Sequence, residues 1–203
     1  MAIVVVGGHS RNVGKTSVVA GLIAALAGYH WTAMKITQHG HGVCSAKGAP
    51  CHCATDNHCW AISEEKDRSG RSDTSRFLLA GAHPVWWVRT EQGRLAEAMP
   101  TVRRKLAAAR NAIIESNSVL KFVRPAVYLT VLDPAVADFK RSAQEFLERA
   151  DAIILHEAKS RNLEWNEVSL KRAEERPVFR IRPPHYVTPE IVEFVKCRLG
   201  AGA

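Results

Sequence analysis

Short apolar runs and helically spaced apolar positions alternate along the chain. The runs are typical of buried strands and lie at 3–6, 30–37, 83–90, 111–115, 127–132, 152–155 and 178–182. Segments with helical spacing lie at 15–27, 73–80, 91–110, 137–149, 163–174 and 189–199, and Pro100 predicts a break or a new first turn in the third of them. The alternation predicts an α/β fold: a single domain over 1–203, with a mostly parallel sheet and helices on both faces.

Residues 38–72 interrupt this alternation. They have no clear period and contain four cysteines and four histidines. Clustered cysteines in a chain without secretory features bind metal more often than they form disulfides. We therefore interpret the stretch as a Cys/His-rich insertion with a metal site, zinc ahead of an iron–sulfur cluster, although the spacing matches neither common motif. Redox-active thiols and a disordered insertion are the alternatives. The candidate ligands are Cys44, Cys51, Cys53 and Cys59, whereas Cys197, in the last predicted helix, is expected in the core.

Composition limits where the protein is expected to work and which ligands it is expected to bind. The 203 residues are enough for one domain with its own core. The chain has no apolar run of about 18 residues and no basic start before the first strand, so we expect a cytoplasmic protein without a membrane span. The net charge of +8 is spread along the chain rather than gathered in a block with aromatic residues. This argues against a nucleic-acid interface and suits phosphate-rich small molecules.

The first strand leads into a glycine-bearing loop and then a helix that starts near Lys15. Strand, loop, Gly-Lys-Thr and helix in this order are typical of a phosphate-binding loop, in which backbone N–H groups and the lysine bind phosphate and the threonine hydroxyl binds Mg²⁺. The strict pattern has glycine where this chain has His9, and Gly8 lies one residue earlier. The predicted nucleotide-binding residues are Gly8, Asn12, Val13, Gly14, Lys15, Thr16 and Ser17, with Thr16 on the metal.

Polar residues at the carboxyl ends of other strands are expected at the same edge of the sheet, where ligands bind in such folds. Glu115 directly follows an apolar strand and is a candidate Mg²⁺ acid, with a surface acid as the alternative. Asp73 is either a second metal acid or only a helix N-cap. Lys35 ends the second strand and either reaches a phosphate or anionic substrate, or is solvated. The segment 180–185 follows the last strand and is a candidate border of the nucleotide base.

The longer loop resembles that of dethiobiotin synthetase and its relatives among the P-loop proteins, a class that includes the nickel-insertion GTPases. A more extensive resemblance, over residues 1–117, is to the family of molybdopterin-guanine dinucleotide biosynthesis protein B. It rests on Lys35 with the histidines after it, on Asp73-Thr74 followed by Ala80-Gly81-Ala82, and on Ile114-Glu115-Ser116. Ser116 replaces the family's glycine, and the Cys-rich insertion is not a general family feature.

The resemblance implies a P-loop NTPase fold and a Mg²⁺-dependent, GTP- or ATP-binding protein, often dimeric, that assists molybdenum-cofactor maturation. Lys15, Lys35 and Glu115 would act in catalysis, and Asp73 and Glu115 would be the acids on the metal. The chain lacks a guanine-reading Asn-Lys-x-Asp, so the base stays open. It also lacks a recognisable arginine finger, so we expect slow turnover.

Two alternatives remain from the sequence. One is a metal-delivery NTPase that carries its cargo on the Cys/His-rich insertion and hands it to a metalloenzyme partner. The other is an ATP-dependent ligase, in which Lys35 and Ser118 face a carboxylate-bearing substrate.

Overall fold

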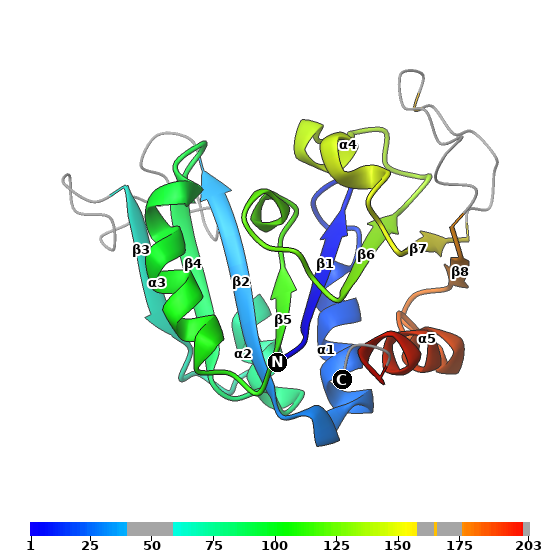
Figure 1. The fold of residues 1–203 in the computed structure, drawn as a ribbon. Helices are drawn as coiled ribbons and strands as arrows, with labels where there is room; N and C mark the ends of the chain where they lie inside the picture. Colours follow the sequence, from blue (N-terminus) through cyan, green and yellow to red (C-terminus); the bar gives the residue numbers. More distant parts are fainter. Residues whose placement is uncertain (40–58, 158–164, 166–175, 201–203) are drawn as a thin grey trace.

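A computed structural model describes residues 1–39, 59–157, 165 and 176–200 (Figure 1). In these residues the sheet has eight strands in the order β3-β4-β2-β5-β1-β6-β7-β8. All neighbours are parallel except β3 and β4. The strands are β1 (Ile3–Gly8), β2 (Trp31–His39), β3 (Trp60–Glu64), β4 (Val85–Glu91), β5 (Asn111–Glu115), β6 (Val127–Leu132), β7 (Ala152–His156) and β8 (Val178–Ile181).

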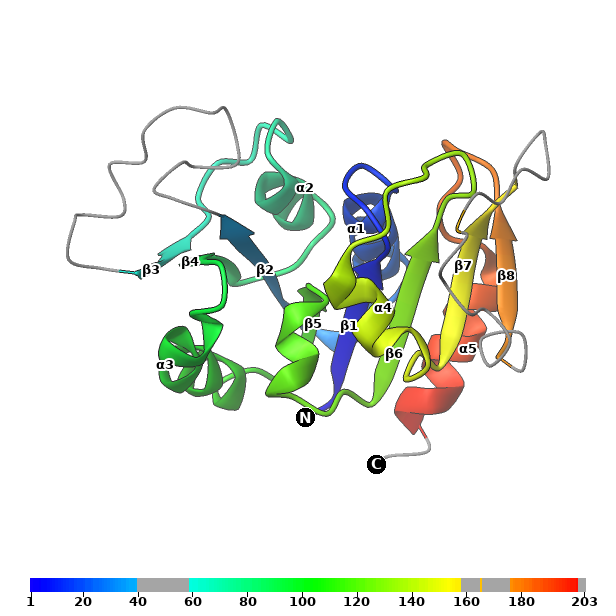
Figure 2. The same cartoon turned by 90° about the horizontal axis from the view of Figure 1, so that it is seen from above.

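Helices cover both faces of the sheet, as predicted. Side chains of α1 (Lys15–Ala25), α2 (Asp73–Leu79) and α5 (Pro189–Gly200) share one buried cluster with the sheet. Side chains of α3 (Leu95–Ala107), α4 (Arg141–Leu147) and the 3₁₀ turn η2 (Ser118–Lys121) pack on the other face, and a second short turn, η1 (Ala27–Tyr29), precedes β2. Figure 2 shows α1 and α2 on one side of the sheet and α3 on the other.

The central strand explains why its sequence is apolar without interruption. Val4 and Val6 belong to the cluster under α1, whereas Val5 belongs to the cluster under α3, and none of the three is exposed. Successive strand residues point to opposite faces, so a strand covered on both sides needs apolar residues at every position. β1 therefore holds the loop that follows it on a rigid, fully buried support.

Four predictions about the elements need correction. β3 lies inside the stretch 38–72, where no element was expected; it is short, half-buried and antiparallel at the edge. α3 continues through Pro100, because a buried stripe from Leu95 to Leu106 holds it against the sheet. α4 starts at Arg141 rather than near 137, since the Lys140 N–H donates to the His9 carbonyl at 2.8 Å. Cys197 is exposed rather than in the core. The predicted helix at 163–174 lies outside the described residues, apart from residue 165.

Within the described residues, the structure has no helix that is both long enough and apolar enough to cross a membrane.

Candidate functional site

The loop between β1 and α1 lies at the carboxyl edge of the sheet, where parallel α/β proteins bind ligands. Asn12 and Gly14 have positive φ values of 58° and 87°. A Cβ on Gly14 would also lie 2.2 Å from a ring carbon of Tyr186, so only glycine fits this position without a rearrangement. The loop thus enters α1 through a backbone turn that leaves no room for a side chain.

His9 occupies the position at which the strict motif has glycine, and it is completely buried. Its ring packs against Phe139 and Trp165, with centroids 5.2 and 5.0 Å away. Nε2 lies 3.1 Å from the carbonyl oxygen of Val136. Burial lowers the pKa of His9, although nearby carbonyl groups oppose this. The side chain therefore anchors the longer loop to the segment after β6.

Asn117 is a site residue that the sequence analysis missed. Its Nδ2 donates to the Gly8 carbonyl, and its Oδ1 accepts from the Gly8 N–H, both at 2.9 Å. A Cβ on Gly7 would lie 2.2 Å from this Oδ1, which explains a glycine at the end of β1. The sequence did offer one signal: Asn117 is a polar residue two positions after Glu115, the last residue of the strand that neighbours β1.

His156, at the end of β7, is a second support that the sequence analysis missed. Its Nε2 lies 3.0 Å from the Val13 carbonyl oxygen, and its Nδ1 lies 3.4 Å from Oδ2 of Asp133. The ring is buried and contacts Tyr186 edge-on at 5.8 Å between centroids. The loop is thus held at three points: its own His9 bonds the segment after β6, and Asn117 and His156 bond it from the ends of β5 and β7.

Lys15 points back into the loop. Its Nζ donates to the Ser10 carbonyl at 2.5 Å and forms no ion pair with any residue in the described ranges. Burial lowers its pKa to about 8, and the nearby Glu115 carboxylate only partly opposes this. The ammonium group is therefore incompletely neutralised by the protein itself.

The predicted acids meet next to Thr16. Glu115 accepts a hydrogen bond from the Thr16 hydroxyl at 2.8 Å and one from Lys35 at 2.7 Å. Asp73 accepts from Lys35 at 2.5 Å. The exposed side-chain fractions are 5% for Glu115, 14% for Lys35 and 45% for Asp73. The structure thus brings together four residues that lie far apart in the sequence.

Lys35 is the internal cation of this cluster. Burial alone would lower its pKa, but Glu115 and Asp73 raise it above the ordinary value. In the same way, burial would raise the pKa of Asp73, but Lys35 outweighs burial and holds it low. Asp73 does not cap α2: the N-cap is Ser72, whose hydroxyl accepts from the Ser75 N–H at 3.0 Å. Two carboxylates and a hydroxyl are oxygen donors of the kind that Mg²⁺ prefers, so the residues present fit that ion.

The cysteine prediction falls mostly outside the described residues. Cys44, Cys51 and Cys53 lie there, whereas the half-buried Cys59 donates its thiol to Oε2 of Glu97 at 2.5 Å. This hydrogen bond raises the pKa of the Cys59 thiol. In the parts of the chain that the structure describes, no group of three or more His, Cys, Asp or Glu residues is placed to hold a metal. The zinc or iron–sulfur site stays a prediction.

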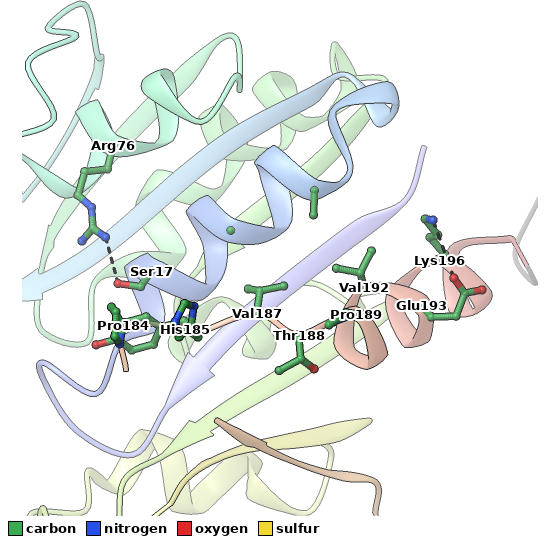
Figure 3. A pocket seen from close by; sticks show the side chains of 13 residues that line it. Ser17, Arg76, Pro184, His185, Val187, Thr188, Pro189, Val192, Glu193 and Lys196 are labelled. Atoms are coloured by element: carbon green, nitrogen blue, oxygen red, sulfur yellow. Dashed lines mark hydrogen bonds and ion pairs between the residues drawn. The ribbon is translucent and has the colours of Figure 1, made fainter. Parts of the chain in front are cut away.

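The charged residues line a pocket of about 800 Å³. A second groove, of about 770 Å³, runs between α1 and α5 and is shown in Figure 3. Ser17, Arg76 and Tyr186 line both, and Arg76 donates to the Ser17 hydroxyl at 3.0 Å. His185, from the predicted base-bordering segment, lines the groove. Ser118, predicted to face a substrate, lines the charged pocket.

The sheet order, the helices on both faces and the loop-to-helix turn at Gly14-Lys15-Thr16 define the class of fold: this is an α/β protein with the P-loop NTPase fold.

Solved structures similar to this chain are P-loop NTPases. HypB from Helicobacter pylori, solved in complex with nickel, is 16% identical; the match covers 98% of this chain and 85% of HypB, with a TM-score of 0.49. LpxK from Aquifex aeolicus, solved with ATP, is 17% identical over 89% of this chain and 53% of LpxK, with a TM-score of 0.48. MobB from Bacillus subtilis is 17% identical over 98% and 97% of the two chains, with a TM-score of 0.40. No protein-family model and no curated protein matches the sequence.

Proposed function

We propose that the protein binds a nucleoside triphosphate, GTP or ATP, together with Mg²⁺ and hydrolyses it slowly. The observation that supports this most strongly is the arrangement of Lys15, Thr16 and Glu115. An incompletely neutralised ammonium group lies in the loop, and a hydroxyl hydrogen-bonded to a buried carboxylate lies one residue further on. In a P-loop protein, the lysine ammonium group binds the phosphate chain, and the hydroxyl and carboxylate bind its Mg²⁺.

In this proposal, each residue of the pocket has a defined task. The loop N–H groups and Lys15 bind the phosphates and stabilise the charge that develops on the transferring phosphoryl group. Thr16, Glu115 and Asp73 would hold Mg²⁺, which would supply positive charge against the phosphates. Lys35 shares both carboxylates with this position, so with Mg²⁺ bound its ammonium group would be available to a phosphate oxygen.

The nucleoside is best accommodated by the groove between α1 and α5. This groove shares Ser17, Arg76 and Tyr186 with the phosphate pocket, so a ligand extends from one into the other without leaving the protein surface. Tyr186 and His185 offer ring faces on which a base stacks. A base held by stacking explains how the chain manages without an Asn-Lys-x-Asp motif.

The resemblance of residues 1–117 supports a role in the biosynthesis of molybdopterin guanine dinucleotide, in the cytoplasm and with a homodimer as the expected assembly. The metal-delivery alternative depends on Cys44, Cys51 and Cys53, which the structure does not describe. The ligase alternative has one specific observation in its favour, because Ser118 and Lys35 line the same pocket.

Hydrolysis assays with Glu115→Gln test the proposal. The substitution keeps the shape of the side chain but removes its charge, so we expect Mg²⁺-dependent release of phosphate from GTP or ATP to fall about 100-fold. Glu145→Gln is the matched control, because Glu145 pairs with Lys121 at 3.0 Å in an exposed ion pair on α4. Equal rates in both variants, or a rate that does not depend on Mg²⁺, would contradict the proposal.

A further inference from the structure

The phosphate pocket has a cationic side that phosphate binding and the Mg²⁺ site leave unused. Arg11 comes from the loop, and Lys140 and Arg141 lie at the start of α4. The Lys140 N–H donates to the His9 carbonyl at 2.8 Å, and the Ser10 hydroxyl donates to Asp138 at 2.6 Å. The loop itself therefore fixes where the backbone of this segment lies.

The three cations of this side lack direct partners. Within the described residues, the side chains of Arg11, Lys140 and Arg141 form no hydrogen bond and no ion pair. Lys140 is half-buried, and burial lowers its pKa; the positive charge of Arg11 adds to the effect, and the carboxylates of Asp138 and Glu115 oppose it only in part. A half-buried ammonium group beside another cation is stabilised when an anion binds next to it. Lys35, by contrast, is neutralised by two carboxylates.

The charges that line the pocket exceed what one nucleotide needs. Its lining includes six cationic residues (Arg11, Lys15, Lys35, Arg76, Lys140 and Arg141) and two acidic ones (Asp73 and Glu115), which leaves four positive charges. A nucleoside triphosphate with its Mg²⁺ carries a net charge of only about −2. Arg11, Lys140 and Arg141 line this pocket together with Ser118, and none of the three lines the groove that suits the nucleoside.

We infer that Arg11, Lys140 and Arg141 bind the anionic group of a second small-molecule substrate, a phosphate monoester or a carboxylate, next to the triphosphate. Guanidinium groups pair with such oxyanions through two parallel hydrogen bonds, which accounts for arginine at two of the three positions. The inference rests on the proposed nucleotide site and names the chemical class of its co-substrate.

Titration calorimetry of the nucleotide-loaded protein tests this site. The full chain is first saturated with Mg²⁺ and a non-hydrolysable triphosphate analogue, which blocks the γ-phosphate position. Inorganic phosphate and succinate are then titrated separately. We expect one of them to bind saturably, and the double variant Lys140→Ala/Arg141→Ala to weaken that binding about tenfold or more. The analogue's own affinity should change less than about threefold, because these side chains serve the second ligand.

A double variant outside the pocket controls for net charge. Arg103→Ala/Arg110→Ala removes the same two charges from exposed positions on and after α3, and it should bind the anion like the wild type. Binding of phosphate alone supports a phosphate monoester, and binding of succinate alone supports a carboxylate. Failure of both anions on a loaded protein overturns the inference, as does equal weakening by both double variants. Failure of the analogue itself to bind contradicts the proposed function instead.

Discussion

Two lysines line the same pocket, and their surroundings change their pKa values in opposite directions. Lys15 belongs to the loop and donates only to a backbone carbonyl, and burial lowers its pKa to about 8. Lys35 lies within β2 and between Asp73 and Glu115, which raise its pKa. The charge of Lys15 therefore opposes folding at neutral pH, whereas the charge of Lys35 supports it.

The opposite pKa shifts of the two lysines indicate two different roles: Lys15 binds a ligand, and Lys35 stabilises the fold. Charged groups that bind a ligand commonly lack a full set of opposite charges in the free protein, and the rest of the fold offsets the cost in stability. Lys15 fits that description, because an incoming phosphate supplies the charge that the protein does not. Lys35 instead neutralises two carboxylates that would otherwise repel each other at the metal position. The comparison predicts opposite effects of removing the two charges.

Lys35→Met should give the larger effect. It leaves Glu115, only 5% exposed, without its cationic partner, so we expect the free energy of unfolding to fall by about 3 kcal/mol. Urea denaturation measures the change. Lys66→Met is the control, because Lys66 is 75% exposed and pairs with a surface carboxylate, and it should change stability by less than about 1 kcal/mol. Similar losses in the two variants would contradict an internal role for Lys35.

Lys15→Met should act in the opposite direction and raise the free energy of unfolding at pH 7 by about 1 to 3 kcal/mol, partly offset by the lost Ser10 hydrogen bond. The folded pKa of about 8 lies below the ordinary 10.5, so the unfolded chain binds more protons between these values, and wild-type stability rises with pH there. The gain from the variant should therefore be complete below pH 8 and shrink towards pH 10.5. Urea titrations at four pH values check this, and a gain that does not change with pH would count against it.

Asn117→Ala should have a smaller but more selective effect. It removes two hydrogen bonds from Gly8, and we expect nucleotide affinity to fall about tenfold, with about 1 to 2 kcal/mol less stability. Asn111→Ala is a close control: Asn111 bonds the Ala2 N–H and the Tyr29 carbonyl at the opposite end of β1, each at 2.9 Å. It should cause a similar loss of stability and leave nucleotide affinity unchanged. Equal affinity losses would mean that Asn117 acts only through stability.

The same comparison shows what the sequence can and cannot reveal. Lys15, Thr16 and the strand before them are neighbours in the chain, and their chemistry is readable from a short motif. Glu115 was placed correctly at the end of β5, because the apolar run before it marks where the strand stops. Lys35, predicted to end its strand, instead lies within β2, which continues to His39. Its contact with Glu115 follows from the sheet order, which puts β5 between β1 and β2, whereas Asp73 reaches Lys35 from the start of α2.

Contacts between distant segments were the least predictable. Asn117 lies 109 residues from Gly8, and no spacing rule relates them. His9 was read as a departure from a motif, yet packing against Phe139 and Trp165 gives it a structural role. Lys140 and Arg141 lie far from the loop in the sequence, and the hydrogen bond from the Lys140 N–H to the His9 carbonyl places them at the pocket. β3 was missed because it is a short edge strand, stabilised by its pairing with β4 rather than by a long apolar pattern.

The most direct test of the account is titration of the full chain with GTP and with ATP in the presence of Mg²⁺. The wild type should bind at least one of them at a single site, and Lys15→Ala should weaken that binding about 100-fold or more. Lys121→Ala changes an exposed ion pair at the end of η2 and should leave the affinity unchanged. Equal affinity of the wild type and Lys15→Ala, or no binding of either nucleotide by the wild type, would contradict the central claim that this loop binds a nucleoside triphosphate.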